Sequence, residues 1–395
     1  FIYMKKVFVH NLNKNCEPAT DLFSKAIRFL ELNDYEIVNS IVDADTALVN
    51  TCAVFKTEED KSIRVVENYI NRPNIEKTIF FGCAANTVDD FKDDDRVEHV
   101  GPKDLEKMND IFQHKVPMNG GGVNQFVESE YIERTSKKLI KNDFYIHISQ
   151  GCTHACTFCN IKAAKGGVTS KPIENIVNDI VNYIQKVRKD SYEFVLQSDD
   201  CGGYGHDFGV DFVDLMEALS EINKDIKYKV SNIHPQDLIR LWPRLKKYVT
   251  KFSYMNIPLE SGSSRIMDLM YRFYSINDVA KILKEIKSIS PETWLFSDFV
   301  INFPTETMDD LKLTLEYGKL YDEKRYINYS EFPDSKSAKI FPKVTDEERI
   351  ERADYISEWM RENGDNAQLC GMEWYYDKDN FINKAMNEAI KTLFK

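Results

Sequence analysis

The sequence predicts an α/β protein: an N-terminal parallel-sheet (Rossmann-like) domain, then a partial (β/α)6 TIM-type barrel and a short helical C-terminal segment. Apolar, strand-like runs alternate with amphipathic runs along most of the chain, which is typical of parallel sheets covered by helices. A glycine-containing polar stretch interrupts this alternation, and the 395 residues suffice for two or three domains. We therefore expect domains at residues 4–115 and 141–340, a linker at 116–140 and a C-terminal segment at 341–395.

The N-terminal domain alternates strand and helix from its first residues. Short apolar runs predict strands at residues 6–10, 46–50 and 78–82. Apolar residues at helical spacing predict helices at 21–32 and 58–70. This order implies a parallel sheet with helices on both faces.

A cysteine follows each of these three strands: Cys16, Cys52 and Cys83. In open parallel sheets, ligands bind beyond the carboxyl ends of the strands. Three cysteines that are far apart in sequence should therefore converge on one edge of the sheet, a geometry that suits a three-thiolate metal cluster. The alternative is three unrelated buried cysteines, which are common in protein cores.

The central domain shows six strand–helix units. The expected strands lie near residues 144–149, 192–197, 228–233, 253–258, 294–301 and 326–332. The clearest helix carries apolar residues from Ile173 to Val187 and has Pro172 at its start. Six such units predict a partial barrel, open on one side, whose chemistry lies at the carboxyl ends of the strands. Beyond it, we expect helices at 346–363 and near 380–393.

The strongest functional signal is the C-x3-C-x2-C spacing of Cys152, Cys156 and Cys159, directly after the first barrel strand. Three thiolates on one short loop can hold three irons of a 4Fe–4S cluster and leave the fourth iron open to a substrate or cofactor. The alternative is a zinc knuckle or a structural cluster. Zinc sites usually complete four ligands with C-x2-C pairs, and no such completion is visible.

Composition limits the cellular context. No apolar run approaches 18 residues, and the N-terminus lacks the core and cleavage site of a signal peptide, so we expect a cytoplasmic protein with no membrane partner. The eight cysteines then indicate metal or redox use rather than disulfides. The net charge of −12 makes a nucleic-acid partner less expected, without excluding a local basic patch.

The cysteine loop, with Phe158 before its last cysteine, resembles the radical S-adenosyl-L-methionine (radical SAM) superfamily. In that superfamily the open iron chelates the amino and carboxylate groups of SAM. One electron from the cluster then releases a 5′-deoxyadenosyl radical, which removes hydrogen from an unactivated carbon.

The segments Asn50-Thr51-Cys52 and Phe81-Gly82-Cys83-Ala84 look like the N-terminal domain of radical SAM methylthiotransferases, where three cysteines bind an auxiliary 4Fe–4S cluster. Cys16 matches less cleanly, because Asn15 precedes it and Glu17-Pro18 follows it where the family has Gly and Asn.

The resemblance extends from about residue 5 to residue 340. Further matching segments are Lys165-Gly166, Ser170-Lys171-Pro172, Leu196-Gln197, His234-Pro235, residues 258–263, residues 270–274 and residues 297–307. Departures from the family pattern are Lys165 and Lys171 for arginine, Glu260 for glutamine, and Asn302 and Thr305 for glycine.

The resemblance implies two 4Fe–4S clusters and SAM as cofactors. Cys152, Cys156 and Cys159 would hold the SAM-binding cluster, and Cys16, Cys52 and Cys83 the auxiliary cluster, with no catalytic residue beyond these ligands. Residues expected to contact SAM are Phe158 (adenine), Glu260, Ser261 and Ser263 (polar parts), Arg272 (carboxylate) and Asp298 (ribose or substrate).

Each of these SAM contacts has a simpler alternative. Phe158 could be a packing aromatic, Arg272 a solvated surface arginine, and Glu260, Ser261 and Ser263 a simple turn and helix cap. His234 is better interpreted as a structural polar residue. Cys201 is interpreted as an inert loop cysteine and Cys370 as a structural one.

The resemblance thus predicts a radical SAM methylthiotransferase that replaces C–H with C–S–CH3 and needs an electron donor such as flavodoxin or ferredoxin. The known families end in a small all-β TRAM domain, whereas residues 341–395 look too few and too helical to form one. We therefore expect a peptide or protein substrate, including a ribosomally made precursor peptide. Alternatives are a transfer RNA substrate, an auxiliary cluster that only moves electrons or anchors substrate, and a non-catalytic iron–sulfur or zinc module.

Overall fold

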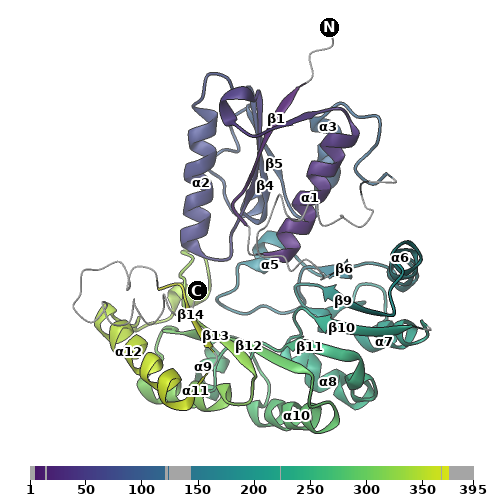
Figure 1. Ribbon diagram of the computed structural model, residues 1–395. Helices are drawn as coiled ribbons and strands as arrows, with labels where there is room; N and C mark the ends of the chain where they lie inside the picture. The colour runs from purple at the N-terminus through teal and green to yellow at the C-terminus, as the bar shows by residue number, and fades with distance from the viewer. Residues whose placement is uncertain are drawn as a thin grey trace.

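The fold consists of two parallel β-sheets with helices packed against them (Figure 1). The computed structural model describes residues 5–13, 16–120, 123, 144–222, 224–365 and 367–372. The predicted α/β class is confirmed, with an N-terminal parallel sheet and a second parallel sheet in the central part of the chain. Most of the predicted linker and the predicted helix near 380–393 lie outside the described residues.

The N-terminal sheet has five strands in the order β2-β1-β3-β4-β5, and every neighbouring pair is parallel. Its elements are β1 (Lys6–Asn11), α1 (Glu17–Leu32), β2 (Glu36–Val38), η1 (Ile41–Asp43), β3 (Thr46–Thr51), α2 (Lys56–Ile70), β4 (Lys77–Gly82), η2 (Cys83–Asn86), β5 (Val97–Val100), η3 (Leu105–Lys107) and α3 (Met108–Ile111). The sequence pattern predicts the three central strands and both long helices, but misses the edge strands β2 and β5. These two strands have only three and four residues, too few for a clear apolar pattern.

Helices cover both faces of this sheet because side chains alternate along its strands. Leu48 of β3 packs in one apolar cluster with the face of α1, whereas its neighbours Ala47 and Val49 pack in a second cluster with α2. In Figure 1, α1 and α2 lie on opposite sides of the strands. The two-faced burial explains why the central strands are continuously apolar.

The second sheet has seven parallel strands in the order β14-β13-β12-β11-β10-β9-β6. Its strands are β6 (Phe144–His147), β9 (Ser191–Gln197), β10 (Asp225–Val230), β11 (Phe252–Asn256), β12 (Trp294–Ile301), β13 (Glu323–Asn328) and β14 (Ala367–Cys370). Among the described residues β6 and β14 are its edges and do not pair, so the sheet is an open barrel, as predicted.

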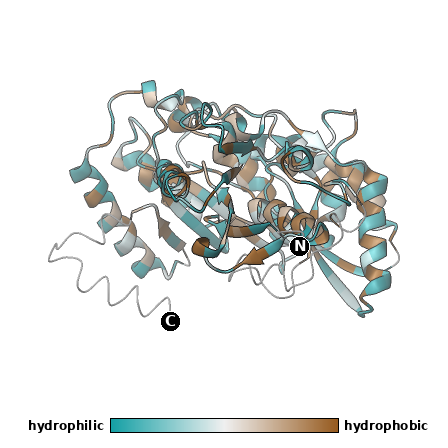
Figure 2. Cartoon of the chain, turned by 90° about the horizontal axis from the view of Figure 1, so that it is seen from above, coloured by the Kyte–Doolittle hydropathy of each residue, from teal (hydrophilic) through white to brown (hydrophobic). Residues whose placement is uncertain are grey.

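Helices cover the outer face of the second sheet (Figure 1). They are α6 (Ile173–Lys186), α7 (Phe212–Ser220), α8 (Pro235–Leu245), α9 (Ser264–Leu269), α10 (Ile276–Ile289), α11 (Met308–Gly318) and α12 (Asp346–Asn363), whereas α5 (Ile161–Lys165) lies between the two sheets. This part of the chain also contains three short 3-10 turns, η4 (Cys201–Gly203), η5 (Lys246–Lys251) and η6 (Ser337–Lys339). It contains one antiparallel strand pair as well, β7 (Ser149–Gln150) with β8 (Thr169–Ser170). The outer helices carry both hydrophilic and hydrophobic residues (Figure 2).

The C-terminal segment differs from its prediction at one point. The expected helix α12 is present, but Ala367–Cys370 form a strand parallel to β13 instead of continuing the helical pattern. A run of four residues is too short to show a strand period, and its conformation comes from pairing with the exposed edge of β13. Among the residues that the structure describes, no helix has both the length and the apolar sequence needed to cross a membrane.

The short helix α5 joins the two sheets. It follows the C-x3-C-x2-C loop in sequence and lies between the two sheets in Figure 1. Asn86 of η2 donates its side-chain N–H to the Ala164 carbonyl at 2.8 Å, and Asn160 donates to the Ala53 carbonyl at 3.1 Å. Ala164 is buried in the same apolar cluster as Cys83. The carboxyl ends of the N-terminal strands therefore meet the cysteine loop of the second sheet.

Candidate functional site

The three N-terminal cysteines follow β1, β3 and β4, which are neighbours in the sheet. Cys16 is the residue before α1, Cys52 comes directly after β3, and Cys83 begins η2. Electrostatic interactions link Cys52 to Cys16 and Cys83 to Cys52. The structure therefore brings together three cysteines, of which the first and the last are more than sixty positions apart in the chain.

Asparagine side chains hold these three strand ends in place. Asn13 donates to the Thr51 carbonyl at 2.9 Å, and Asn50 donates to Asn11 Oδ1 at 2.9 Å. The Thr51 hydroxyl donates to the Phe81 carbonyl at 2.6 Å, which ties β3 to β4. Sequence analysis did not single out Asn11 or Asn13. The available signal was a polar amide at the end of an apolar strand, just before a cysteine loop.

Gly82 allows the chain to turn sharply into Cys83. Its φ is +100°, and a Cβ at this position would lie 2.8 Å from Asn50 Oδ1 and 2.8 Å from the Thr51 carbonyl oxygen. Any side chain would therefore clash with the neighbouring strand end as well as strain the backbone. The glycine before Cys83 is required for this cysteine to approach the other two.

The N-terminal thiols lie in a protected environment. Burial raises the pKa of Cys52 and of Cys83 to about 11 each, and the Lys165 ammonium partly opposes the increase at Cys83. Neutral thiols are therefore the stable form of the protein without metal at neutral pH. Thiolates form here when a cation compensates their charge, which is the usual behaviour of buried metal-binding cysteines.

The second cysteine set occupies one loop after β7. The Cys152 N–H donates to the Gly166 carbonyl at 3.3 Å, the His154 N–H donates to Cys152 Sγ at 3.4 Å, and the Cys159 N–H donates to the Cys156 carbonyl at 3.2 Å. Cys152 interacts electrostatically with Cys156 and Cys159. The three sulfurs of this loop therefore also converge.

Cys159 is the most accessible of the six cysteines. Its side chain is exposed, yet the surrounding protein removes enough bulk water to raise the pKa of its thiol to about 12. The Glu260 carboxylate interacts electrostatically with Cys159.

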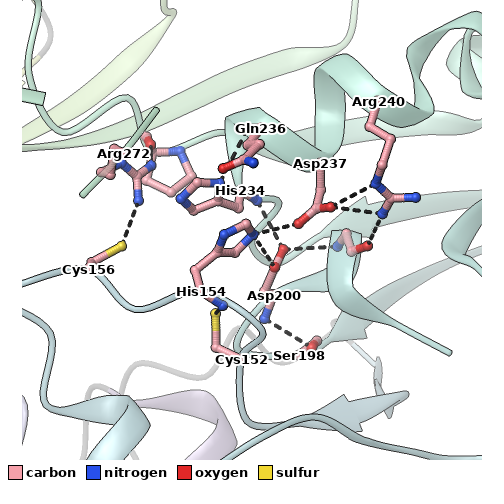
Figure 3. Close-up of polar contacts among 12 residues, drawn as sticks. Cys152, His154, Cys156, Ser198, Asp200, His234, Gln236, Asp237, Arg240 and Arg272 are labelled. Atoms are coloured by element: carbon pink, nitrogen blue, oxygen red, sulfur yellow. Dashed lines mark hydrogen bonds and ion pairs between the residues drawn. The ribbon is translucent and has the colours of Figure 1, made fainter. Parts of the chain in front are cut away.

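Arg272 is buried beside the loop. It is 3% exposed, and its Nη1 donates to Cys156 Sγ at 3.4 Å while Nε donates to the Tyr274 hydroxyl at 3.2 Å. Figure 3 shows this guanidinium pointing at Cys156. The alternative of a solvated surface arginine is therefore wrong. A role at the SAM carboxylate stays a prediction, and Arg272 is placed to stabilise negative charge on Cys156.

His154 anchors the other side of the loop. Its Nε2 lies 2.6 Å from Asp237 Oδ2 and 3.5 Å from Asp200 Oδ2, and Arg240 holds Asp237 from the far side at 2.8 Å (Figure 3). These two carboxylates raise the pKa of His154 to about 9 against the opposing effect of burial. The protonated imidazole thus ties the cysteine loop to η4 and α8.

His234 supports this network as the structural residue that the sequence indicated. Its Nδ1 accepts a hydrogen bond from the Gln236 N–H at 3.2 Å, which caps α8. Its ring stacks on His154 with centroids 3.5 Å apart and planes 14° apart. One ligand atom from each of His154, His234 and Asp237 lies within 4.8 Å of the others, a spacing compatible with a metal site, but in this structure His154 Nε2 is paired with Asp237 Oδ2 at 2.6 Å.

Glu260 follows the end of β11, and Asp298 lies within the neighbouring strand β12. Glu260 has a φ of +69°, and its backbone pairs with that of Phe299 in an isolated bridge. Burial raises the pKa of Glu260 to about 7, although Arg272 opposes the increase from 4.0 Å. Asp298 accepts two hydrogen bonds from Arg325, at 2.7 and 2.9 Å. Arg325 is a partner that sequence analysis missed.

Three of the expected SAM contacts also make contacts within the protein, and their role at SAM stays a prediction. The Ser261 hydroxyl lies 3.4 Å from that of Thr314, and the Ser263 hydroxyl donates to Asp310 at 2.6 Å while capping α9. Both serines are at most 3% exposed. Phe158 packs edge-on against Phe303 at 6.4 Å. These are the contacts of a turn, a helix cap and a packing aromatic, the alternatives stated for them.

The two cysteines outside the sites have separate surroundings. Cys201 is fully buried, with Sγ 3.5 Å from the Leu196 carbonyl oxygen, and Cys370 lies on the edge strand β14. All eight cysteines, each in the described part of the chain, are present as thiols. Two groups of three converging thiols fit iron–sulfur clusters better than disulfides, because each group brings together an odd number of sulfurs.

Comparisons with known proteins agree with this two-part architecture. A family model described as Radical SAM superfamily matches residues 146–318, and one described as Uncharacterized protein family UPF0004 matches residues 16–100. Threonylcarbamoyladenosine tRNA methylthiotransferase MtaB of Thermotoga maritima is 28% identical over 321 residues, 79% of this chain and 72% of that protein. Ribosomal protein uS12 methylthiotransferase RimO of Citrobacter koseri is 29% identical over 306 residues, 73% of this chain and 67% of that protein.

The chain is a relative of the radical SAM methylthiotransferases. Among solved structures, the radical S-adenosylmethionine methyltransferase TsrM of Kitasatospora setae, with cobalamin and a [4Fe-4S] cluster bound, gives a TM-score of 0.53 at 10% identity over 85% of this chain and 74% of that one. This likeness supports the fold alone. The match of residues 146–318 to the Radical SAM superfamily model implies a 4Fe–4S cluster and SAM as cofactors.

Proposed function

We propose that this radical SAM methylthiotransferase inserts a methylthio group at a C–H bond of a peptide or protein substrate, using two 4Fe–4S clusters and two molecules of SAM. The observation that carries the proposal is the meeting of two converging cysteine triads across α5. Each triad would leave one iron without a protein ligand. Sulfur insertion needs this arrangement, because the sulfur and the substrate radical must share one space.

The chain's own residues have distinct tasks in this reaction. Cys152, Cys156 and Cys159 would hold the cluster at which SAM supplies the radical, and Cys16, Cys52 and Cys83 the cluster that carries the sulfur. Arg272 stabilises thiolate charge at Cys156 through its 3.4 Å contact. The ion pair of His154 with Asp237 holds the loop in the conformation in which its N–H meets Cys152 Sγ.

The same proposal assigns the parts of the chain. Residues 4–115 would form the auxiliary-cluster domain and residues 141–340 the radical SAM unit, joined by a linker at 116–140 and followed by a segment at 341–395 for substrate recognition or packing. Glu260 faces the region of Cys159 and is the strongest of the proposed SAM contacts, since its carboxylate is not engaged in a close ion pair.

The substrate class rests on charge. A net charge of −12 does not favour the many phosphate contacts of an RNA complex, so a peptide or protein is preferred. A transfer RNA substrate is the second candidate, and the name of the MtaB relative favours it. A flavodoxin or ferredoxin would supply the electron.

The test is an anaerobic reaction of the reconstituted protein with SAM, reductant and candidate substrates, followed by mass spectrometry. A product that gains one sulfur and one CH2 supports methylthio insertion. Deoxyadenosine with no sulfur transfer on any substrate would contradict it. Substrate binding that weakens steeply between low and moderate salt identifies RNA rather than peptide.

A further inference from the structure

A buried lysine lies between the two cysteine triads. Lys165 is the last residue of α5 and is 5% exposed. Lysine is almost never buried to this extent without a partner, because removing an ammonium from water is strongly unfavourable unless an opposite charge compensates it. Its partner is Asp199, whose Oδ1 lies 2.7 Å from Lys165 Nζ.

Asp199 connects this lysine to the start of the second cysteine loop. Its other oxygen, Oδ2, accepts a hydrogen bond from the Gly151 N–H at 2.8 Å. Gly151 immediately precedes Cys152 and has a φ of +81°, and a Cβ there would lie 2.2 Å from the Gly167 carbonyl oxygen. The carboxylate is therefore fixed on both oxygens, and it fixes the ammonium in turn.

The Lys165 ammonium also interacts with the N-terminal cysteine triad. Lys165 interacts electrostatically with Cys83 and Cys16, and the charge on Lys165 is one of the influences on the Cys83 thiol. The Asn86 hydrogen bond to the Ala164 carbonyl holds the preceding residue against η2, which begins with Cys83. The second sheet thus contributes a cation to a site whose thiols come from the first sheet.

Asp199 accepts one of the three N–H bonds of the ammonium. A buried ammonium with further donors, whose charge acts on Cys83 and Cys16, matches a small anion bound among the N-terminal thiols. Thiolate and sulfide are the anions that iron–sulfur chemistry brings to such a place.

We propose that Lys165 is an anion-binding residue of the N-terminal site, where its ammonium holds an anionic sulfur ligand, sulfide or methanethiolate, at the position that Cys16, Cys52 and Cys83 leave open. This inference rests on the proposed function, because it takes the N-terminal triad to hold a cluster. It assigns a role to a residue outside both triads, which comes from α5 and not from the N-terminal sheet that carries Cys16, Cys52 and Cys83. The lysine is then as much a part of the sulfur-carrying site as the cysteines.

The test uses the full chain with Cys152→Ala, Cys156→Ala and Cys159→Ala, so that only the N-terminal site can hold a cluster. After anaerobic reconstitution, sodium sulfide or sodium methanethiolate is titrated, and binding is followed by electron paramagnetic resonance of the reduced cluster. In this background Lys165→Met should weaken binding of either anion by at least about tenfold, equal to about 1.4 kcal/mol. It should also lower the midpoint potential, since a cation stabilises the reduced, more negative cluster.

Two further variants make the result specific. Lys165→Arg keeps the charge and should stay within about threefold of the parent affinity, about 0.7 kcal/mol. Lys171→Met removes a lysine that pairs with Asp179 at the surface of the same unit, and should change nothing. If Lys165→Met holds less iron than its parent, Lys165→Gln replaces it as the neutral variant.

The outcomes separate the two proposals. Absence of iron in the parent triple variant would overturn the proposed N-terminal cluster, and with it this inference. A normal cluster whose anion affinity and potential are the same in the parent and in the neutral Lys165 variant would overturn the inference alone, and would leave Lys165 as a structural ion pair between the two sheets.

Discussion

The two cysteine triads are built in opposite ways. Cys152, Cys156 and Cys159 lie on one short loop, which side chains from other elements hold from two sides: Arg272 contacts Cys156, and Asp237 pairs with His154 of the loop. The N-terminal triad has no common loop and comes from the ends of three neighbouring strands. A local site depends on its clamps, whereas a site assembled from distant strands depends on the register of a whole sheet.

The largest expected effect on activity comes from replacing one cysteine in each triad. Cys156→Ala should abolish SAM cleavage, because the open iron that binds SAM is lost. Cys52→Ala should leave cleavage to deoxyadenosine intact and abolish methylthio transfer. Chromatography of deoxyadenosine and mass spectrometry of the product measure both activities. Each variant should hold about four irons against about eight in the parent.

If deoxyadenosine formation falls equally in Cys52→Ala and Cys156→Ala, the two triads are not functionally separate. Product formation that is slower but unchanged in kind in Cys52→Ala would instead point to an auxiliary cluster that only transfers electrons or anchors substrate.

The next effect concerns the clamp on the loop triad. Arg272→Met removes a buried cation and leaves the Pro258 carbonyl and the Tyr274 hydroxyl without their donor. We expect a loss of about 3 kcal/mol in the free energy of unfolding of the metal-free protein, measured by urea denaturation. Arg361→Met, at an exposed pair with Glu358, should cost less than about 0.5 kcal/mol.

If Arg272→Met unfolds at the same urea concentration as Arg361→Met, the guanidinium is not part of the loop's structure. The N-terminal triad should keep its iron in Arg272→Met, since that site does not depend on this clamp.

His154 gives a smaller effect on the same loop. His154→Gln removes the ion pair with Asp237 but leaves the backbone N–H that meets Cys152 Sγ. Partners of metal ligands typically contribute about 10- to 100-fold in metal affinity or activity, so deoxyadenosine formation should fall by about that factor. Arg240→Met, which loosens Asp237 from the exposed side, should have a weaker effect in the same assay. An unchanged rate and unchanged iron content in His154→Gln would show that the loop holds its shape alone.

The smallest expected effect concerns the N-terminal triad, whose cysteines follow three strand ends. Asn13→Ala deletes the 2.9 Å hydrogen bond to the Thr51 carbonyl, next to Cys52. Urea denaturation should show a loss of about 1 kcal/mol, and iron should leave the N-terminal site first when chelator is added. Asn363→Ala, an exposed asparagine at the end of α12, serves as the control. Faster iron loss from the loop triad in Asn13→Ala would contradict the separation of the two sites.

The same contrast explains what the sequence could predict. The triad of Cys152, Cys156 and Cys159 is visible in a spacing of a few residues, and six of the seven strands of the second sheet, all but β14, follow from their apolar runs. The N-terminal triad needed one more step, namely the rule that parallel strand ends meet at one edge. That step succeeded because Cys52 and Cys83 directly follow their strands.

Features that depend on packing could not be predicted. The sequence does not show that Arg272 is buried or that Arg325 donates hydrogen bonds to Asp298. Nor does it show that Ser261 and Ser263 are buried and make contacts within the protein. Each of these features depends on which elements pack together. The edge strand β14 has no pattern of its own. Asn302 and Thr305, which replace family glycines, have φ of +62° and +70°, a conformation that favours glycine.

The most direct test of the account measures whether the two triads hold clusters that face each other. Both clusters of the reconstituted protein are reduced, and the electron paramagnetic resonance spectrum is compared with the sum of the spectra from Cys52→Ala and Cys156→Ala. Two clusters that meet across α5 should couple magnetically, so the parent spectrum should be broadened and split relative to that sum. A parent spectrum equal to the sum, at about eight irons per chain, would contradict the shared space on which methylthio insertion depends.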